Sequence, residues 1–218
     1  MRIGIIGAGN IGGALTRRLT ALGHEVRVAN SRGPETLLDL ARETGATPVH
    51  AREAADGAAV VVVTIPEGRV PQLPADVLAG APEGAAVVDT GNYYPRRDGR
   101  IQAIEDGMPE SVWVQGHLGR PVLKAFNNIG AQSLLTGGLP PGTPGRIALP
   151  VAGDDVEAKA VVMSLVDSLG FDPIDAGALA ESWRQQPGTP VYVKNLDAQG
   201  VRRALAEASP ERPESFRA

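Results

Sequence analysis

The chain has 218 residues, 43% of them hydrophobic and 4% aromatic, and a net charge of −4. This length and composition predict one α/β domain with an appendage, and the absence of a basic stripe argues against nucleic acid as a partner. Since the chain has no cysteine and only three scattered histidines, disulfides, a cysteine nucleophile and a metal site are not expected.

The sequence carries no sign of a targeting or membrane segment. Its first residues lead directly into a strand-like run without a cleavage site, and no apolar stretch reaches the roughly 18 residues of a membrane span. We therefore expect a cytoplasmic protein with no membrane partner.

The first 90 residues alternate between predicted strands and helices. Short apolar or alternating runs predict strands, and apolar residues at helical spacing, ended by glycine, predict helices. The β-branched run Val60–Ile65 is typical of a strand covered on both faces, which favours a parallel sheet. The predicted strands are 2–6, 25–29, 47–49, 60–65 and 86–89, and the predicted helices are 10–22, 34–44, 51–56 and 68–79.

The second half of the chain is less regular. The pattern at 91–110 allows only a short helix at 100–106, and glycine-rich stretches predict loops around His117 and at 137–145. The last ten residues lack apolar content and are expected to be disordered. Further strands are expected at 122–126, 146–151 and 171–175, and further helices at 156–169, 178–186 and 197–208.

The alternation from residue 2 to about residue 176 predicts a doubly wound parallel sheet of Rossmann type. We expect residues 1–150 to form the dinucleotide-binding core and 151–208 to form a small C-terminal α/β lobe, mainly helical, that completes the same domain. Residues 209–218 are the expected tail. In such a sheet, ligands bind past the carboxyl ends of the strands, where the strand order reverses.

The stretch GIIGAGNIGGAL contains the pattern Gly7-x-Gly9-x-x-Gly12 between a predicted strand and a predicted helix. In that context Gly7 permits a tight turn, Gly9 lets the backbone approach a pyrophosphate, and Gly12 allows the helix to pack closely on the strand. The free N–H groups and the dipole at the helix start face the phosphates. The alternative is a glycine-rich turn that binds no ligand.

The end of the second strand indicates which dinucleotide to expect. A carboxylate there would bind the ribose 2′-hydroxyl of NAD, but the sequence has Ser31 and Arg32, a hydroxyl and a forked cation that suit a 2′-phosphate. We therefore predict NADP(H), and the alternative is that Arg32 is a solvated loop cation. The residues that end the strand at 60–65 are expected to border the nicotinamide half; they are Thr64, Ile65 and Pro66.

Four stretches carry a resemblance to a known family: GIIGAGNIGGALTRRLTALGHEVRVANSR, VVVVTIP, VLKAFNNI and PVAGDDVEAKAVVMSLVDSLGFDPIDAG. From residue 1 to about residue 180 the chain resembles the F-420-dependent NADP reductase family, which also contributes the nucleotide domain of membrane metalloreductases. The resemblance implies an NADPH-binding Rossmann domain, usually a homodimer, that exchanges hydride between NADPH and a deazaflavin (coenzyme F-420) or a flavin. It implies pyrophosphate contacts from Gly9, Asn10 and Ile11, 2′-phosphate contacts from Ser31 and Arg32, and nicotinamide ribose contacts from Thr64 and Pro66.

Two segments depart from the family pattern, DTGNYYPRRDGR at 89–100 and ESWRQQPGTPVYVKNLDAQGVRRAL at 181–205. Both are expected on the second-substrate side of the cleft, so the resemblance carries over the cofactor and not the acceptor. Tyr93 and Asn127 follow predicted strands at that edge and are our candidate substrate contacts. The alternatives are a packing role for Tyr93 and a turn role for Asn127.

Hydride transfer between two stacked rings needs proximity and exclusion of water more than an acid or a base, so we assign no catalytic side chain. An imine or carbonyl acceptor requires a proton donor, for which the candidates are Tyr93, Tyr94, His117 and Lys124. Lys124, in a predicted buried strand, otherwise snorkels or pairs with a carboxylate. Carboxylates at helix starts are expected to act as caps.

Three functions are consistent with the sequence. The first is an NADP(H)-dependent oxidoreductase that transfers hydride between NADPH and deazaflavin or flavin. The alternatives are an NADPH-dependent reductase of a small imine or carbonyl, and a non-catalytic redox sensor that binds NADPH.

Overall fold

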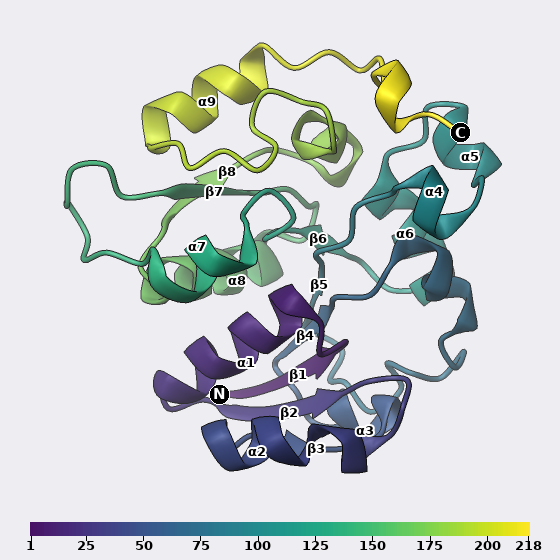
Figure 1. The fold of residues 1–218 in the computed structure, drawn as a ribbon, viewed down its shortest axis with the longest axis vertical. Helices are drawn as coiled ribbons and strands as arrows, with labels where there is room; N and C mark the ends of the chain where they lie inside the picture. The colour runs from purple at the N-terminus through teal and green to yellow at the C-terminus, as the bar shows by residue number, and fades with distance from the viewer.

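The computed structural model describes all 218 residues and contains a main sheet of six parallel strands (Figure 1). The strands lie in the order β3-β2-β1-β4-β5-β6, so the order reverses between β1 and β4. This arrangement confirms the predicted doubly wound α/β fold. The strands are β1 (Arg2–Ile6), β2 (Glu25–Ala29), β3 (Thr47–Pro48), β4 (Val60–Val63), β5 (Ala86–Asp89) and β6 (Leu123–Lys124).

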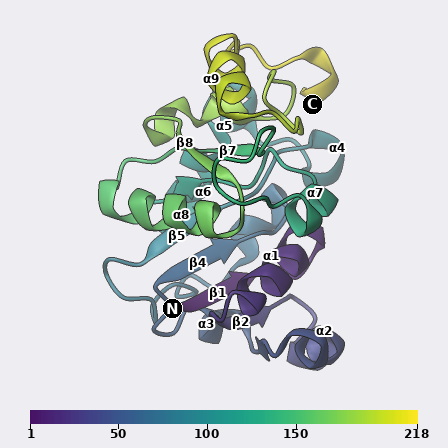
Figure 2. The same ribbon diagram turned by 90° about the vertical axis from the view of Figure 1, so that its left-hand side faces the viewer.

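Helices cover both faces of the main sheet, which explains why β4 is apolar throughout. Val60 and Val62 belong to one core with residues of α1 (Asn10–Ala21) and α8 (Val156–Ser168), which lie on the same side of the sheet in Figure 2. Val61 and Val63 belong to a second core with α3. The other helices are α2 (Leu38–Thr44), α3 (Ala51–Ala54), α4 (Pro95–Asp98), α5 (Gln102–Glu105), α6 (Glu110–Leu118), α7 (Ala131–Thr136) and α9 (Ala198–Ala206), with 3-10 helices η1 (Pro34–Leu37), η2 (Glu67–Gln72), η3 (Leu179–Gln185) and η4 (Glu214–Phe216).

The last two strands form a sheet of their own. β7 (Ala148–Val151) and β8 (Asp172–Asp175) pair in parallel, and a single antiparallel bridge between Lys124 and Ala152 joins them to the main sheet. Helix α9 packs on this small sheet and closes a third apolar core. The expected division between residues 150 and 151 stays a prediction, and in the structure that boundary falls within β7.

The helix expected at 68–79 is wrong. The structure has only the short 3-10 helix η2 there, and Leu73 already has an extended backbone. Pro71 and Pro74 lack the N–H groups that a continuing α-helix would need, so the segment leaves the helical path. As a result, residues 67–74 form an irregular wall beside the carboxyl end of β4.

The loop expected around His117 is also wrong, because His117 lies in the last turn of helix α6. Gly119 ends that helix with a left-handed backbone at φ 64°, so glycine acts here as the terminator and not as part of a loop. His117 is exposed, and its Nδ1 atom lies 2.9 Å from the carbonyl oxygen of Trp113 in the preceding turn. The imidazole therefore contacts the preceding turn of its own helix.

The C-terminal tail packs against the protein, contrary to the expectation of disorder. Arg212 Nη2 donates to Glu110 Oε1 at 2.5 Å, and the centre of the Phe216 ring lies 6.1 Å from that of Tyr94. One cation and one aromatic ring therefore anchor a segment whose composition is otherwise polar. No helix of the structure combines the length and the apolar character needed to cross a membrane.

Candidate functional site

The glycine loop joins β1 to α1 at the edge where the strand order reverses. Gly7 has φ 116°, and a Cβ atom there would lie 2.2 Å from the carbonyl oxygen of Thr64. A Cβ atom on Gly12 would lie 1.9 Å from the carbonyl oxygen of Gly7. Both positions therefore require glycine, Gly7 for the turn and Gly12 for the approach of helix to strand.

Gly9 has a different role from its two neighbours in the motif. Its backbone is extended, with φ −74°, and a Cβ atom there would meet no protein atom within 4 Å. Gly9 is also the N-cap of α1 and offers no side chain to bond the first N–H groups of the helix. Open space therefore lies over a helix start whose N–H groups can bind an anion.

A cavity of about 720 Å³ opens beside this loop, across the carboxyl ends of β1, β2 and β4. The structure thus brings together most of the predicted cofactor residues, and no Asp or Glu is among the residues that line the cavity. The lining residues are Ile6, Gly7, Ala8, Gly9, Asn30, Ser31, Arg32, Ala51, Thr64, Ile65, Pro66, Arg69, Gln72, Leu73 and Pro74.

Three predicted cofactor residues lie outside that cavity. Asn10 lines a neighbouring hollow of about 490 Å³ between α1 and α2, which Arg32 also borders. Ile11 is half-buried and packs against the main core, and Gly12 is buried. Ile11 and Gly12 therefore support the loop through packing, and a contact with a pyrophosphate at either would come from backbone atoms.

The turn after β2 holds Ser31 and Arg32 at the rim of the cavity. The backbone N–H of Arg32 donates to Asn30 Oδ1 at 2.9 Å, and Asn30 Nδ2 donates to Thr36 Oγ1 at 2.9 Å. Both Ser31 and Arg32 are exposed, and the Arg32 guanidinium has no carboxylate partner. Asn30 thus fixes the turn, and the hydroxyl and the guanidinium stay free to bind an anion.

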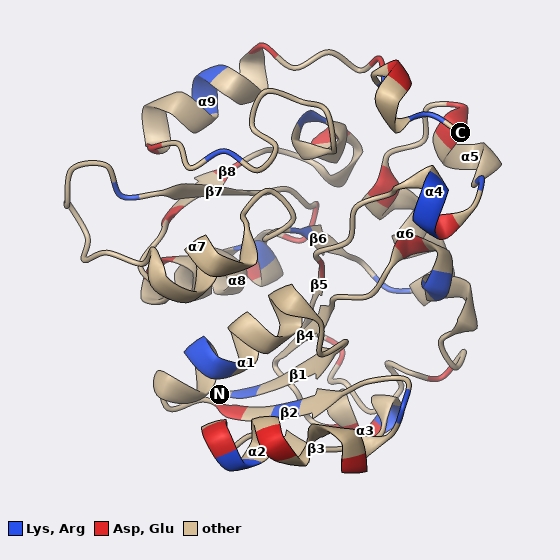
Figure 3. Cartoon of the chain, in the orientation of Figure 1, with Lys and Arg blue, Asp and Glu red and all other residues tan.

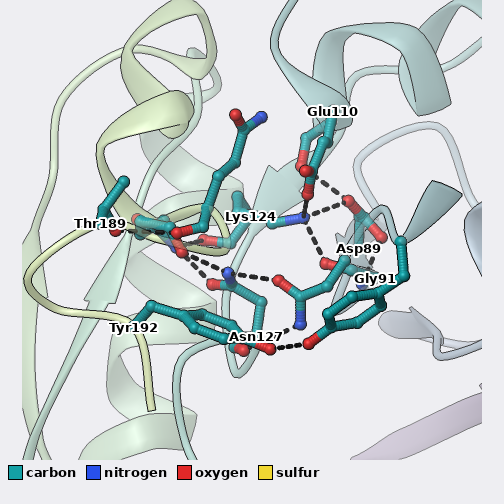
Figure 4. Close-up of polar contacts among 12 residues, drawn as sticks. Asp89, Gly91, Glu110, Lys124, Asn127, Thr189 and Tyr192 are labelled. Carbon is teal, nitrogen blue, oxygen red and sulfur yellow. Dashed lines mark hydrogen bonds and ion pairs between the residues drawn. The ribbon is translucent and has the colours of Figure 1, made fainter. Parts of the chain in front are cut away.

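A buried charge cluster lies at the same edge of the sheet, past the ends of β4, β5 and β6 (Figure 4). It consists of Glu67, Asp89, Glu110 and Lys124, each at most 2% exposed, and Figure 4 labels the last three. Lys124 Nζ donates to Asp89 Oδ2 at 3.0 Å and to the carbonyl oxygen of Gly91 at 2.6 Å, and it lies 3.9 Å from Glu110 Oε2. Of the two roles left open for a non-catalytic Lys124, the structure shows the carboxylate pair.

The carboxylates of the cluster keep Lys124 charged although it is fully buried. Burial opposes its charge, but Asp89, Glu110 and Glu67 together raise the pKa of Lys124 above its ordinary value. Burial also raises the pKa of Glu110, against the opposing effect of Lys124 and Arg212. Glu67 and Glu110 begin η2 and α6, and both are buried within the cluster.

Glu67 is the acid of the cluster without a partner. Neither of its carboxyl oxygens has a hydrogen-bond partner, and the side chain is fully buried. Burial in the first place, and the nearby charge of Asp89 in the second, raise the pKa of Glu67 well above its ordinary value. Both effects favour the protonated form of Glu67 over its carboxylate.

The free energy of unfolding of the wild-type protein is expected to fall as the pH rises, and replacement of Glu67 by glutamine is expected to make that fall less steep. The pKa of Glu67 is higher in the folded protein than in the unfolded chain. Its contribution to the free energy of unfolding is therefore complete below the ordinary pKa of 4.5, and it is lost as the pH rises toward the folded-state pKa. The slope for one proton is about 1.4 kcal/mol per pH unit. Glutamine has a similar shape and no proton to lose. Urea unfolding of both proteins from about pH 5 to about pH 9 measures the two slopes, and equal slopes would contradict a raised pKa for Glu67.

Asn127 lies past the end of β6 and ties three segments together. Its Nδ2 atom donates to Asn92 Oδ1 at 3.1 Å and to the carbonyl oxygen of Gln185 at 2.6 Å, and its Oδ1 atom accepts from Gln185 Nε2 at 3.0 Å. The residue is 4% exposed. Asn127 therefore holds the loop after β5 and the helix η3 against β6, and its role as a substrate contact stays a prediction.

Tyr93 does not face the cavity. It is fully buried, its hydroxyl accepts from the Ile101 N–H at 3.1 Å, and the Arg212 guanidinium lies 5.1 Å from its ring centre. The geometry supports the packing role for Tyr93. The neighbouring Tyr94 is half-buried, and its hydroxyl bonds that of Tyr192 from the C-terminal segment (Figure 4).

Sequence reasoning missed several residues of this region, among them Glu67, Asp89, Glu110 and Tyr192. A signal for two of them is present in the sequence, since Glu67 and Asp89 lie at or just after the ends of apolar strands, where functional side chains gather. Glu110 and Tyr192 give no local signal. Glu110 reaches Lys124, and Tyr192 reaches Tyr94, through tertiary contacts that no spacing in the sequence specifies.

The sheet order, the glycine loop and the acid-free cavity define an α/β protein of the dinucleotide-binding class. Residues 2–93 match the family described as NADP oxidoreductase, coenzyme F420-dependent. The N-terminal part of the chain is therefore similar to this family of NADP-dependent oxidoreductases.

Two solved structures resemble this chain over most of its length. A hypothetical protein, SMa0349 from Sinorhizobium meliloti, is 33% identical over 90% of this chain and 95% of its own, with a TM-score of 0.74. A putative F420-dependent NADP-reductase from Arthrobacter sp. FB24 is 26% identical over 82% of this chain and 86% of its own, with a TM-score of 0.67. Each of these matches extends well beyond the 2–93 segment that matches the family.

Curated relatives match this chain over part of their length. The metalloreductase STEAP3 of Rattus norvegicus is 30% identical over 186 residues, which is 83% of this chain and 35% of STEAP3. The chain covers 56% of the length of one curated relative and 35% of the length of STEAP3.

Proposed function

We propose that the protein transfers hydride between NADPH and a second ring system, a deazaflavin (coenzyme F-420) or a flavin. The observation that carries the NADPH part is the cavity beside the glycine loop, which has Ser31 and Arg32 at the end of β2 and no acidic lining residue. A carboxylate at that position would repel a 2′-phosphate and favour NAD. The family description supports the deazaflavin acceptor.

Each part of the cavity fits one part of the cofactor. The open space over Gly9 and the free N–H groups of α1 accommodate the pyrophosphate. Ser31 and Arg32 bind the 2′-phosphate, and Thr64, Ile65 and Pro66 border the nicotinamide ribose. When bound, NADPH supplies the hydride, and the chain positions it and keeps water away.

A second candidate is the reduction of a small imine or carbonyl. The hydroxyl pair of Tyr94 and Tyr192, half-buried between the loop after β5 and the C-terminal segment, favours this alternative because it offers an O–H donor. Replacement of Tyr94 by phenylalanine separates the two functions. Hydride transfer to a ring acceptor is expected to survive that change, whereas reduction of an imine or carbonyl is expected to fall steeply.

We also expect the protein to form a homodimer.

A spectroscopic assay of NADPH oxidation tests the proposed function, with deazaflavin, FMN and FAD as acceptors and NADH as the parallel donor. We expect rapid transfer to deazaflavin or a flavin with NADPH preferred. Binding of NADPH without transfer to any ring acceptor would contradict the proposal and leave the imine or carbonyl reductase and the redox sensor.

Replacement of Arg32 by glutamine is expected to lower kcat/KM for NADPH about tenfold or more and to change that for NADH little. The reason is that a charge-assisted hydrogen bond to a phosphate contributes about 1.5–3 kcal/mol. Steady-state kinetics with both donors measure the effect. Arg202→Gln is the matched control, because Arg202 is an exposed cation on α9, outside the cavity. An equal loss for NADPH and NADH would contradict the role of Arg32.

A further inference from the structure

A second arginine faces the cofactor cavity from the opposite wall to Arg32. β2 and β4 flank β1 on its two sides, so their carboxyl ends lie about 10 Å apart across the sheet. Arg32 follows the end of β2, and Arg69 lies in η2 after the end of β4. Both side chains line the same cavity of about 720 Å³.

Neither guanidinium in this cavity has a carboxylate partner. The Arg69 side chain donates only to Gln72 Oε1, at 3.0 Å, and the Arg32 side chain makes no hydrogen bond within the protein. The acidic residue nearest in sequence, Glu67, points away into the buried cluster, where a Cβ atom on Gly91 would lie 2.5 Å from its carboxyl. Figure 3 shows acidic segments on α2, on α3 and beside β5, but no Asp or Glu is among the residues that line the cavity.

Two uncompensated cations in one cavity favour a bound anion with more than one negative charge. The glycine loop and the start of α1 already offer N–H groups to a pyrophosphate. Arg69 lies at a different place, in the segment that also contributes Leu73 and Pro74, with Ala51 nearby. These three apolar residues suit the face of a nucleoside base, which marks this end of the cavity as the adenosine end.

We propose that Arg32 and Arg69 together clamp the 2′-phosphate of NADPH, one from each wall of the cavity, so that Arg69 is a second residue that determines specificity for NADPH over NADH. The inference rests on the proposed function, because it requires NADPH as the cofactor. A phosphate has enough acceptor oxygens for two guanidinium forks.

The test is calorimetric binding of 2′,5′-ADP and 5′-AMP, a pair of probes that differ only by the 2′-phosphate, to wild type and to Arg69→Gln. Glutamine removes the charge, and because Arg69 is exposed the fold should be unaffected. We expect affinity for 2′,5′-ADP to fall about tenfold and affinity for 5′-AMP to stay within twofold. Arg69→Lys keeps the charge and is expected to recover part of the loss, and Arg202→Gln is expected to match wild type.

Two outcomes would overturn this inference and leave the proposed function in place. One is that Arg32→Gln weakens 2′,5′-ADP binding while Arg69→Gln does not. The other is that Arg69→Gln weakens both probes equally, which would assign Arg69 to the 5′-phosphate or the base. If wild type binds neither NADPH nor 2′,5′-ADP, the proposed function fails as well, so the two failures are distinguishable.

Discussion

Replacement of Lys124 by methionine is expected to lower the free energy of unfolding by about 3–5 kcal/mol, the range for breaking a buried ion pair by removing one partner. Lys124 is fully buried and bonds Asp89 Oδ2 and the carbonyl oxygen of Gly91. Methionine fills a similar volume but leaves the Asp89 carboxylate with only the Ser111 hydroxyl and the Gly91 N–H as donors. The cost is that of a buried carboxylate without a counter-charge.

Urea unfolding of Lys124→Met and wild type measures this loss. The matched control is Arg52→Met, because Arg52 pairs with Asp76 at 2.7 Å while its side chain is 63% exposed. Removal of that surface pair is expected to cost less than about 1 kcal/mol. A loss at Lys124 no larger than the loss at Arg52 would contradict the account of the buried charge cluster.

Replacement of Gly9 by valine is expected to weaken NADPH binding about 100-fold or more while the stability of the protein changes by only about 1 kcal/mol. A side chain at Gly9 meets no protein atom, and φ −74° is open to valine. It would instead fill the space that a pyrophosphate needs. Two lost charge-assisted hydrogen bonds of about 1.5–3 kcal/mol each account for the factor.

Two further variants separate binding from folding in this experiment. Gly12→Val is expected to reduce both stability and binding, because a Cβ atom there would lie 1.9 Å from the Gly7 carbonyl oxygen. Gly116→Val, on the exposed side of α6, also meets no atom within 4 Å and is expected to leave NADPH binding unchanged. Calorimetric titration with NADPH and urea unfolding give both quantities. Wild-type affinity in Gly9→Val would contradict the assignment of the loop.

The parts of the fold that follow from local patterns are predictable from the sequence. The apolar runs of β1 and β4 and the helix α1, which ends before Gly23, agree with the structure to within two residues. The order of these elements is enough to predict the doubly wound sheet, because parallel strands joined by helices have few topologies open to them. The position of the cavity follows as well, since it lies at the ends of β1, β2 and β4.

The second-substrate side depends on contacts between distant segments, and the sequence does not reveal them. Lys124 lies 35 positions from its partner Asp89, and Arg212 lies 102 positions from Glu110. Whether a tyrosine packs in the core or faces a cavity also depends on these contacts. The position of Tyr93 after a strand is therefore not enough to predict a substrate contact. The tail illustrates the same point, since two anchoring side chains in it are enough to overcome a polar composition.

The most direct test of the central claim is a side-by-side calorimetric titration of the wild-type protein with NADPH and with NADH. The arginine-lined, acid-free cavity predicts tight binding of NADPH and binding of NADH that is weaker by about tenfold or more. Equal affinities, or a preference for NADH, would contradict the assignment of the Ser31 and Arg32 rim as a 2′-phosphate site.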